Sequence, residues 1–167
     1  MNARLRAALL ALALFAGASS VAVAQQGLVG VWRLLSWVHS PQGGGDEVAP
    51  WGSNPMGFIS YTAGGRMSAV VTAPERKASA ANTQQLPTEE QAQLLRTVFA
   101  YAGSYSLEGD GVVLHHVEVA SDPNWSGTHQ RRFFKIEGNR LTITTPPLRI
   151  LAESVARVHT LVWERVE

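Results

Sequence analysis

The spacing of short β-prone runs and turn residues constrains the fold of this chain more than any other feature. From Leu28 onward, runs rich in β-branched and aromatic residues alternate with glycine, asparagine and aspartate, a pattern that is typical of an antiparallel meander. Strands are predicted at residues 30–39, 57–62, 66–72, 103–108, 112–120, 130–137, 140–145 and 157–165. A meander of this kind can close into a barrel whose interior packs side chains or holds one small ligand.

The connections between these runs support the same fold. Tight turns are predicted at Ala63-Gly64-Gly65, Gly109-Asp110-Gly111 and Gly138-Asn139, because glycine and asparagine accept a positive φ. One helix interrupts the meander, since Thr88-Glu89-Glu90-Gln91 has the pattern of a capping box and precedes apolar residues at helical spacing. We expect this helix to cover or plug one end of the barrel. The predicted fold is therefore an all-β, antiparallel up-and-down β-barrel of about eight strands with one interrupting helix.

Residues 1–24 have the pattern of a cleavable export signal. Arg4 and Arg6 precede an apolar run at residues 7–16, and Ala22-Val23-Ala24 matches a cleavage site. The apolar run is shorter than the roughly 20 residues that a bilayer-spanning helix needs, so no stable membrane anchor is expected. Residues 25–167 are expected to form a single β-barrel domain that is periplasmic or secreted.

Charge and cysteine content exclude several classes of partner and chemistry. The predicted signal contains two of the 14 basic residues and none of the acidic ones, which leaves 12 basic against 13 acidic residues and a formal charge of −1. Without a net positive charge or a basic run, no nucleic-acid partner is expected. The chain has no cysteine, which excludes disulfides, thiol catalysis and thiolate metal sites. No cofactor is predicted, and the sequence leaves the oligomeric state open.

Six segments in one order carry a resemblance to a known family. They are LVGVWRL at 28–34, GGRMS at 64–68, AYAGSY at 100–105, HHVEV at 115–119, DPNWSGT at 122–128 and LVWER at 161–165. Together they resemble the bacterial lipocalin-like domain family, a calycin-type β-barrel, and the resemblance implies a barrel that encloses a pocket. In lipocalins the tryptophan of Gly-x-Trp closes the barrel floor beneath an arginine from near the C-terminus. Trp32 and Arg165 match these two positions.

The interior face follows from the alternation of side chains along a strand. His115 and His116 are adjacent, so they point to opposite faces and cannot bind one metal ion together; no metal site is predicted. If the hairpins pair symmetrically about their loops, Tyr105 lies opposite Leu114 and His116 lies opposite Arg132. The shared face is then apolar toward one end and polar toward the other, which is how small-molecule pockets are commonly built.

The candidate site residues lie at the polar end of this face and in the loop beside it. The candidate ligand-binding residues are Tyr101, Tyr105, His116, Glu118, Trp125, Arg132 and Thr145. His116 beside Glu118 is the candidate catalytic pair, while Arg132 can stabilise an oxyanion or hold a ligand carboxylate. Gly103, opposite His116, leaves room for a ligand. The same groups could instead form a buried network that serves packing alone.

These assignments depend on strand register. A one-residue slip at the connection 121–128 would turn the polar cluster outward and make His115 the interior histidine. The leading hypothesis is an exported protein that binds a small, largely apolar molecule with a polar or anionic end inside the barrel. A cofactor-independent isomerase, cyclase or lyase that uses the same pocket is an alternative, and a surface-acting scaffold or inhibitor without a pocket is another.

Overall fold

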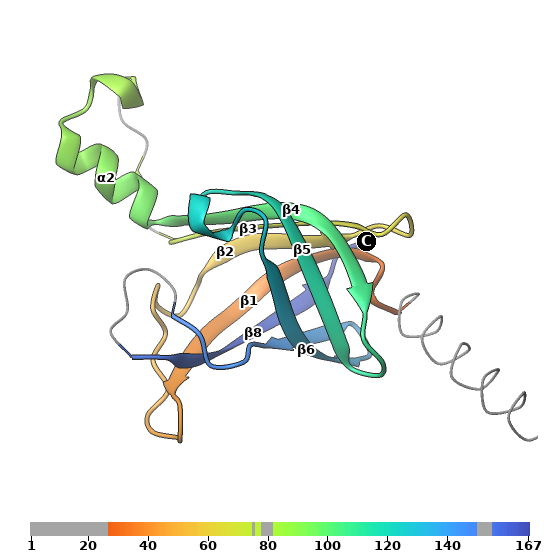
Figure 1. Ribbon diagram of the computed structural model, residues 1–167. Coiled ribbons are helices and arrows are strands. Elements are labelled where there is room, and N and C mark those ends of the chain that lie inside the picture. Colours follow the sequence, from red (N-terminus) through yellow and green to blue (C-terminus); the bar gives the residue numbers. More distant parts are fainter. Residues whose placement is uncertain (1–26, 75, 78–81, 150–154) are drawn as a thin grey trace, which may run out of the picture.

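A computed structural model describes residues 27–74, 76–77, 82–149 and 155–167, whose strands form one closed antiparallel barrel (Figure 1). Each strand pairs with its neighbours in the chain and β8 pairs with β1, so the sheet has no free edge. The strands are β1(Gly30–Pro41), β2(Met56–Tyr61), β3(Arg66–Thr72), β4(Val98–Leu107), β5(Val112–Ala120), β6(His129–Glu137), β7(Arg140–Thr144) and β8(Arg157–Arg165). The predicted eight-stranded barrel is confirmed. The predicted export signal lies outside the described residues.

Side chains alternate between the interior and the outer wall along the strands. In β1 a bulge between Leu34 and Ser36 shifts this alternation by one residue. As a result Trp32 and Leu34 before the bulge, and Trp37 and His39 after it, are all buried. One strand thus supplies two large indoles to the interior at different heights of the barrel.

The two ends of the barrel differ in the length of their connections. Tight turns join the strands at residues 62–65, 108–111 and 138–139, near the C-terminus (Figure 1). Gly65 and Gly138 have φ values of +78° and +61°, which confirms the predicted need for positive φ at these turns. The longer connections, which join β1 to β2, β3 to β4, β5 to β6 and β7 to β8, leave and re-enter the barrel at the other end, which we call the mouth.

The end opposite the mouth is closed by the predicted tryptophan and arginine. Trp32 is fully buried, and the Arg165 guanidinium carbon lies 4.0 Å from the centre of the indole ring. The Trp32 Nε1 donates to the Leu28 carbonyl at 2.9 Å, and Arg165 donates to the Val29 and Gly27 carbonyls. A guanidinium over an indole contributes about 1 kcal/mol, and here it also ties the chain entering β1 to the end of β8.

The helix α2(Thr88–Arg96) stands away from the barrel instead of covering it (Figure 1). The Ala73 amide donates to the Thr97 carbonyl at 3.0 Å, so the pairing of β3 with β4 continues past the rim and carries the helix outward. None of its residues is buried. The predicted helix exists, but the expected capping box does not form, because Pro87 occupies the N-cap without a side-chain hydrogen bond. The expectation that it plugs the barrel is wrong.

The short 3₁₀ helices η1(Thr83–Gln85) and η2(Pro123–Trp125) lie in the connections on either side of β4 and β5. Among the described residues, no helix combines the length and apolar character needed to cross a bilayer. The elements outside the barrel wall are therefore short, and those that approach the interior do so at the mouth.

The register of β5 differs from the symmetric pairing that the sequence suggested. Tyr105 lies opposite His115, one residue along from its predicted partner, and His116 lies opposite His129, three residues away from its predicted partner. The β6–β7 hairpin pairs as predicted. Both shifts are by an odd number of residues, so the side chains of β5 that were predicted to face inward face outward, and the reverse. The strands β4 and β6 keep their predicted inward faces.

Two local features produce this change. The turn between β4 and β5 pairs Leu107 with Val113, so the pairs from there to Gly103 and Val117 lie one residue along from the predicted register, and a bulge beyond Gly103 then skips Glu118. At the start of β6, Val117 and Thr128 extend the ladder through a 2.9 Å hydrogen bond, which makes the connection asymmetric. His115 is consequently inside the barrel and fully buried. His116 and Glu118 lie on the outer wall, and their predicted interior position is wrong.

Candidate functional site

A cavity of about 50 Å³ lies in the half of the barrel nearest the mouth. It is lined by Trp37, Ile59, Ala69, Val71, Phe99, Tyr101, Trp125, Arg132, Ile143, Thr145, His159, Leu161 and Trp163. This space can hold a few water molecules, because one water needs roughly 10–15 Å³. Ligand pockets usually measure about 300–1,000 Å³. A ligand of more than a few atoms therefore enters only when some of the lining side chains move.

A larger hollow, of about 1,230 Å³, lies outside the barrel between α2 and the segment 51–54. It is open to solvent, and it exists because α2 stands away from the rim (Figure 1). The side chains that border it include Arg76, Lys77 and Glu90, with Trp51 on the opposite side. No buried polar group faces this hollow among the residues that border it, so the interior cavity is the better candidate site.

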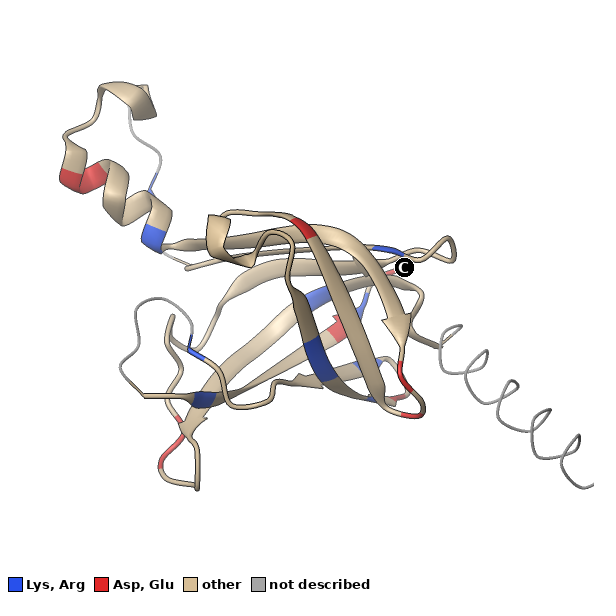
Figure 2. Cartoon of the chain, viewed as in Figure 1, with Lys and Arg blue, Asp and Glu red and all other residues tan. Residues whose placement is uncertain are grey.

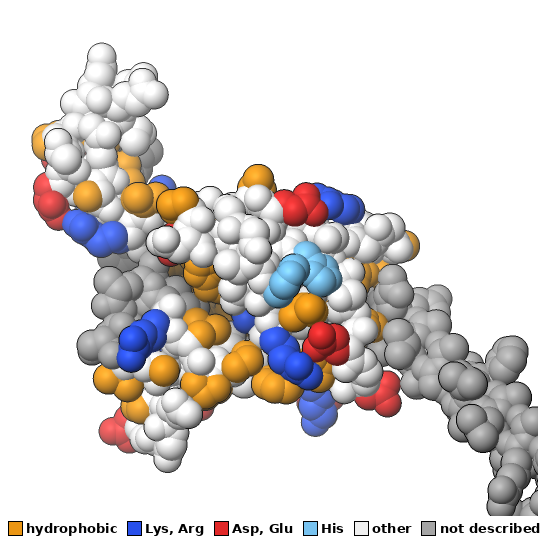
Figure 3. Space-filling view, viewed as in Figure 1, with side chains coloured by type: hydrophobic (Ala, Val, Ile, Leu, Met, Phe, Trp, Pro, Cys, Tyr) orange, Lys and Arg blue, Asp and Glu red, His pale blue; other side chains and the backbone are white. Residues whose placement is uncertain are grey.

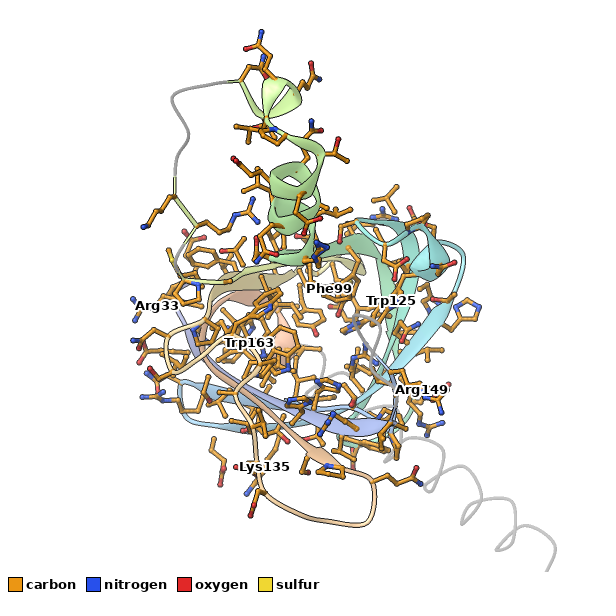
Figure 4. The ribbon with its side chains drawn as sticks, turned by 90° about the vertical axis from the view of Figure 1, so that its left-hand side faces the viewer. Arg33, Phe99, Trp125, Lys135, Arg149 and Trp163 are labelled. Carbon is orange, nitrogen blue, oxygen red and sulfur yellow. The ribbon has the colours of Figure 1, made fainter. Side chains whose placement is uncertain are left out.

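Aromatic side chains close the cavity toward the mouth. Trp125, on η2, packs edge to face against Phe99 with ring centres 4.8 Å apart, and Tyr101 lies 5.5 Å from the same indole. Figure 4 looks into the mouth and shows Phe99 and Trp125 side by side at the rim, with Trp163 inside the ring of strands. Asp122 holds η2 in place by accepting from the Asn124 amide at 3.0 Å. These rings offer apolar faces to a flat ligand.

Arg132 is the charged group at this cavity. Its side chain is buried, with 5% of the residue exposed. The guanidinium donates to the Arg131 carbonyl at 2.8 Å, lies 3.5 Å from the Gln130 Oε1 and sits 5.5 Å from the Trp125 ring centre. No ion pair within the described residues includes it. Burying a guanidinium without a carboxylate is costly, and an anionic group in the cavity would offset that cost.

On the outer wall, in contrast, arginine side chains form ion pairs. Arg33 pairs with Glu164 at 2.7 Å, and Arg131, the outward neighbour of Arg132, pairs with Glu108 at 3.1 Å. Figure 2 shows that basic and acidic residues are spread along the chain. Arginines on the surface thus find carboxylate partners there. Arg132 is separated from these carboxylates because it lies in the interior.

Below the cavity, His115 joins two tyrosines. The Tyr61 hydroxyl lies 2.8 Å from its Nε2, and the Tyr101 hydroxyl lies 3.0 Å from its Nδ1. A neutral imidazole has one N–H donor and one acceptor nitrogen, so one tyrosine donates to the ring and the other accepts from it. The accepting tyrosine keeps its own hydroxyl hydrogen for a different acceptor. Because Tyr101 lines the cavity, one of the two tautomers leaves its hydroxyl hydrogen available to another acceptor there.

Burial keeps this network neutral near pH 7. Burial first, and then the charges of Arg132 and His116, lower the pKa of His115 well below its ordinary value of 6.5. Burial raises the pKa of Tyr61 well above 10.0. Burial also raises the pKa of Tyr101, against the lowering effect of Arg132. Arg132 is therefore the group that supplies charge to the cavity, and the tyrosines supply hydroxyl groups.

The closed barrel, the Trp32 floor and the interior cavity can now be compared with known proteins. The sequence profile of the lipocalin-like domain matches residues 29–166. The chain belongs to the lipocalin-like domain family. The resemblance seen in the six sequence segments is thereby confirmed, and the match extends over all eight strands of the barrel.

One curated relative of this lipocalin-like domain is a carrier protein of Aspergillus oryzae. It is named the 4'-hydroxy-3'-methoxypropiophenone carrier protein and is 36% identical over 64 residues. The aligned part covers 34% of this chain and 58% of the relative. The two proteins are therefore similar over a part of each chain.

Most of the predicted ligand-binding residues lie inside the lipocalin-like barrel. Tyr101, Trp125, Arg132 and Thr145 line the cavity. Tyr105 is also buried but lies nearer the floor, where its hydroxyl donates to the Thr62 carbonyl at 2.9 Å. Three of these five residues, Tyr101, Tyr105 and Arg132, lie on β4 and β6. Their interior positions therefore do not depend on which face of β5 points inward.

The two remaining predicted residues lie outside. Glu118 accepts two hydrogen bonds from Arg66, at 2.6 and 2.9 Å, on the outer wall. His116 contacts Ser106 and His129 there. The candidate catalytic pair therefore does not reach the cavity, because β5 presents its other face to the interior. His115, the interior histidine of the alternative register, takes that place.

His159 and Trp37 line the cavity and were not among the predicted site residues. The Trp37 Nε1 donates to the His159 Nδ1 at 3.0 Å, and the His39 ring stacks on His159 with centres 5.3 Å apart. A signal for His159 was present in the sequence, because it is separated from Leu161 and Trp163 by even numbers of residues and therefore shares their face. No such pattern marks Trp37, because the bulge in β1 places it on the same face as Leu34 although the two are separated by an odd number of residues.

Acidification is expected to destabilise this lipocalin-like domain through its interior histidines. Burial, followed by the charges of His39, Arg132 and Arg157, lowers the pKa of His159 to about 4, and the pKa of His115 is also lowered. Below about pH 6.5 the unfolded chain takes up protons that the folded chain does not. Urea unfolding should therefore give a constant free energy above about pH 7 and a decrease between about pH 6.5 and 4, of at most about 1.4 kcal/mol per pH unit for each histidine.

A His129→Gln variant is the matched control for this experiment, because it removes an exposed imidazole from the outer wall whose charge is not among the causes that lower the pKa of His115 or His159. It should keep the pH dependence of the wild type, whereas His159→Gln should reduce it. A free energy of unfolding that stays constant from about pH 6.5 to 5 in the wild type would contradict the expectation.

Proposed function

We propose that this lipocalin-like domain binds and carries a small, largely apolar aromatic molecule with a polar or anionic end, in the half of the barrel nearest the mouth. The polar end lies at Arg132 and Tyr101, and the apolar body lies against Trp125 and Phe99. The proposal covers binding and transport without a chemical step.

The buried Arg132 guanidinium is the observation that carries this proposal. Its guanidinium borders the cavity and forms no ion pair among the described residues. A carboxylate or a phenolic oxygen could accept hydrogen bonds from it, and charge-assisted hydrogen bonds of this kind are the stronger ones in proteins. Thr145 and Tyr101 add hydroxyl groups at the same cavity. The polar end of a ligand would thus have several partners in one place.

The shape and chemistry of the rest of the cavity support an aromatic ligand. Trp125, Phe99 and Trp163 provide ring faces and edges, against which aromatic molecules pack well. The name of the Aspergillus oryzae carrier describes an aromatic ketone with a phenolic hydroxyl. A molecule of that kind has a flat apolar body and polar oxygen atoms, which agrees with the two parts of this cavity.

Binding requires the mouth to open. The cavity of about 50 Å³ is too small for an aromatic ring with substituents. Trp125 is the side chain best placed to move, because it is carried by the short η2 in the connection between β5 and β6 and not by a strand of the wall. Phe99 and Tyr101 lie on β4 and would stay as the fixed side of the pocket.

Export completes the proposal. Residues 1–24 have the charged, apolar and cleavable parts of a signal peptide, so the ligand would be a molecule met in the periplasm or outside the cell. The alternative of an isomerase, cyclase or lyase with His116 and Glu118 loses its catalytic pair, because both residues lie on the outer wall. The alternative of a scaffold without a pocket is disfavoured by the cavity at Arg132.

Native mass spectrometry of the protein purified from the exported fraction tests export and binding together. We expect a mass that lacks residues 1–24 and an additional species with a small bound molecule. Titration of the ligand-free protein with aromatic carboxylates and phenolic ketones should then quench tryptophan fluorescence, because Trp37, Trp125 and Trp163 line the cavity. An aromatic carboxylate should bind about 10 to 100 times more tightly than its neutral amide.

The outcome against the proposal is equally specific. If no aromatic acid or phenol gives a saturable fluorescence change, and no small molecule leaves with the purified protein, the cavity is only a packing defect. Full-length protein retained in the cytoplasm would reject export and leave the binding proposal to be decided by the titration.

A further inference from the structure

Two histidines form a close pair on the outer wall, on the side of the sheet away from the cavity. His116 of β5 lies directly opposite His129 of β6 in the ladder. Their Nδ1 atoms are 2.9 Å apart, and the rings meet edge to face with centres separated by 4.8 Å. Figure 3 shows histidine side chains gathered at the surface of this wall. The pair is therefore accessible to ions from solvent.

The nitrogen atoms are spaced almost as a metal chelate requires. A tetrahedral ion with metal–nitrogen bonds of about 2.0–2.1 Å holds two ligand nitrogens about 3.3 Å apart. The observed separation of 2.9 Å differs from this by a small rotation of the rings. Without an ion, two lone pairs cannot face each other at this distance, so one Nδ1 carries a proton that the other accepts. When a metal ion binds both Nδ1 atoms, this proton moves to the Nε2 of the same ring, so that each imidazole stays neutral.

The sheet holds the two side chains in position before any ion arrives. Directly opposed residues of antiparallel strands keep their Cβ atoms about 4.5–5.5 Å apart, so little conformational freedom remains to be lost. Ser106 on β4 adds a second constraint, because its Oγ lies 2.9 Å from the His116 Nε2. A hydroxyl can either donate or accept, so Ser106 supports the tautomer with a free Nδ1 as well as the other. Partners of this kind orient metal-binding histidines.

We propose that His116 and His129 bind one divalent first-row transition-metal ion through their Nδ1 atoms, with Ser106 as the residue that orients His116. Imidazole suits Cu²⁺, Ni²⁺ and Zn²⁺, with Cu²⁺ bound most tightly, and disfavours Ca²⁺ and Mg²⁺. The described residues contain no group of three or more histidine, cysteine, aspartate or glutamate side chains that could hold an ion together. Water or a small anion therefore completes the coordination, and the bound ion is exchangeable.

Neighbouring charges do not supply a third ligand. Glu118, two residues from His116 on the same strand, is engaged by Arg66 through two hydrogen bonds. Arg131, two residues from His129, pairs with Glu108. The site is a two-imidazole chelate, and its affinity depends on both rings being present.

Titration of the untagged protein with Cu²⁺ and Zn²⁺, followed by calorimetry and by electron paramagnetic resonance for Cu²⁺, tests this site. We expect one ion per chain and a signal from two nitrogen ligands. His116→Gln and His129→Gln should each weaken binding at least about 10-fold, because one imidazole remains. Ser106→Ala should weaken it by less than about 10-fold, because this serine is exposed and hydrogen-bond partners of metal ligands reach about 10-fold only when they fix the ring firmly.

Arg131→Gln is the matched control, since it changes an outward side chain of the same strand and leaves both imidazoles. It should bind the ions as tightly as the wild type or slightly more tightly, because a nearby positive charge is removed. Circular dichroism establishes that each surface variant is folded. The site is rejected if both histidine variants keep the wild-type affinity, or if the wild type binds no ion at one per chain.

Discussion

Replacing Arg132 with methionine is expected to weaken binding of an aromatic carboxylate on the order of 100-fold while leaving the ligand-free protein equally or more stable. The loss of affinity follows because the guanidinium is the charged group at the cavity. The gain in stability follows because this guanidinium is buried and forms no ion pair within the described residues. Methionine fills a similar length without the cost of burying a charge. Opposite effects on affinity and stability distinguish a ligand-binding residue from a packing residue.

Arg131→Met is the control for this prediction. Arg131 directly precedes Arg132 on β6, points outward and pairs with Glu108. Its loss should change stability by less than about 1 kcal/mol and leave ligand affinity unchanged. Fluorescence titration with the carboxylate and with its neutral amide measures the two affinities, and urea unfolding measures stability. If Arg132→Met binds the carboxylate like the wild type, the anionic end of the ligand does not lie at this residue.

Replacing Gly103 with alanine is expected to destabilise the barrel by more than about 3 kcal/mol. A Cβ atom at this position would lie 1.9 Å from the carbonyl oxygen of His116 and 3.0 Å from the amide nitrogen of Glu118. Both are backbone atoms of β5 at the bulge, so no side-chain rotation can relieve the overlap. The strands β4 and β5 would have to separate, which breaks the ladder on which the position of His115 depends.

Gly64→Ala is a suitable comparison for Gly103→Ala. The nearest atom to a Cβ at Gly64 is the Thr62 Oγ1, at 3.9 Å, which is an ordinary contact. This variant should unfold within about 1 kcal/mol of the wild type. Urea unfolding followed by circular dichroism measures both variants. A change below about 1 kcal/mol for Gly103→Ala would mean that the bulge can absorb the methyl group.

Gly103 also illustrates how a residue can be singled out for an incorrect reason. Its lack of a side chain suggested room for a ligand beside His116, on the assumption that the two residues share the interior. In the structure the space above Gly103 is occupied by the backbone of β5. The glycine is required by the close approach of two strands, a role that a sequence position alone does not reveal.

Much of the site was nevertheless predictable. Arg132 and Tyr101 were expected inside, and both line the cavity. Their strands, β6 and β4, are separated by β5, and their inward faces did not depend on how β5 pairs with either. His115 could be identified only as the alternative to His116, because the choice between adjacent residues is decided by register.

The sequence by itself determined the number of strands and their tight turns, and its resemblance to the lipocalin-like family implied the Trp32–Arg165 floor. The strands and turns follow from local preferences of glycine, β-branched and aromatic residues, and from period-two alternation. Only the tertiary structure decided which face of β5 is interior, that α2 leaves the barrel rim, and that His116 meets His129. These depend on the register set at the turn between β4 and β5, on an asymmetric connection and on the packing of strands distant in the chain, because pairing energy over the whole barrel sets the register.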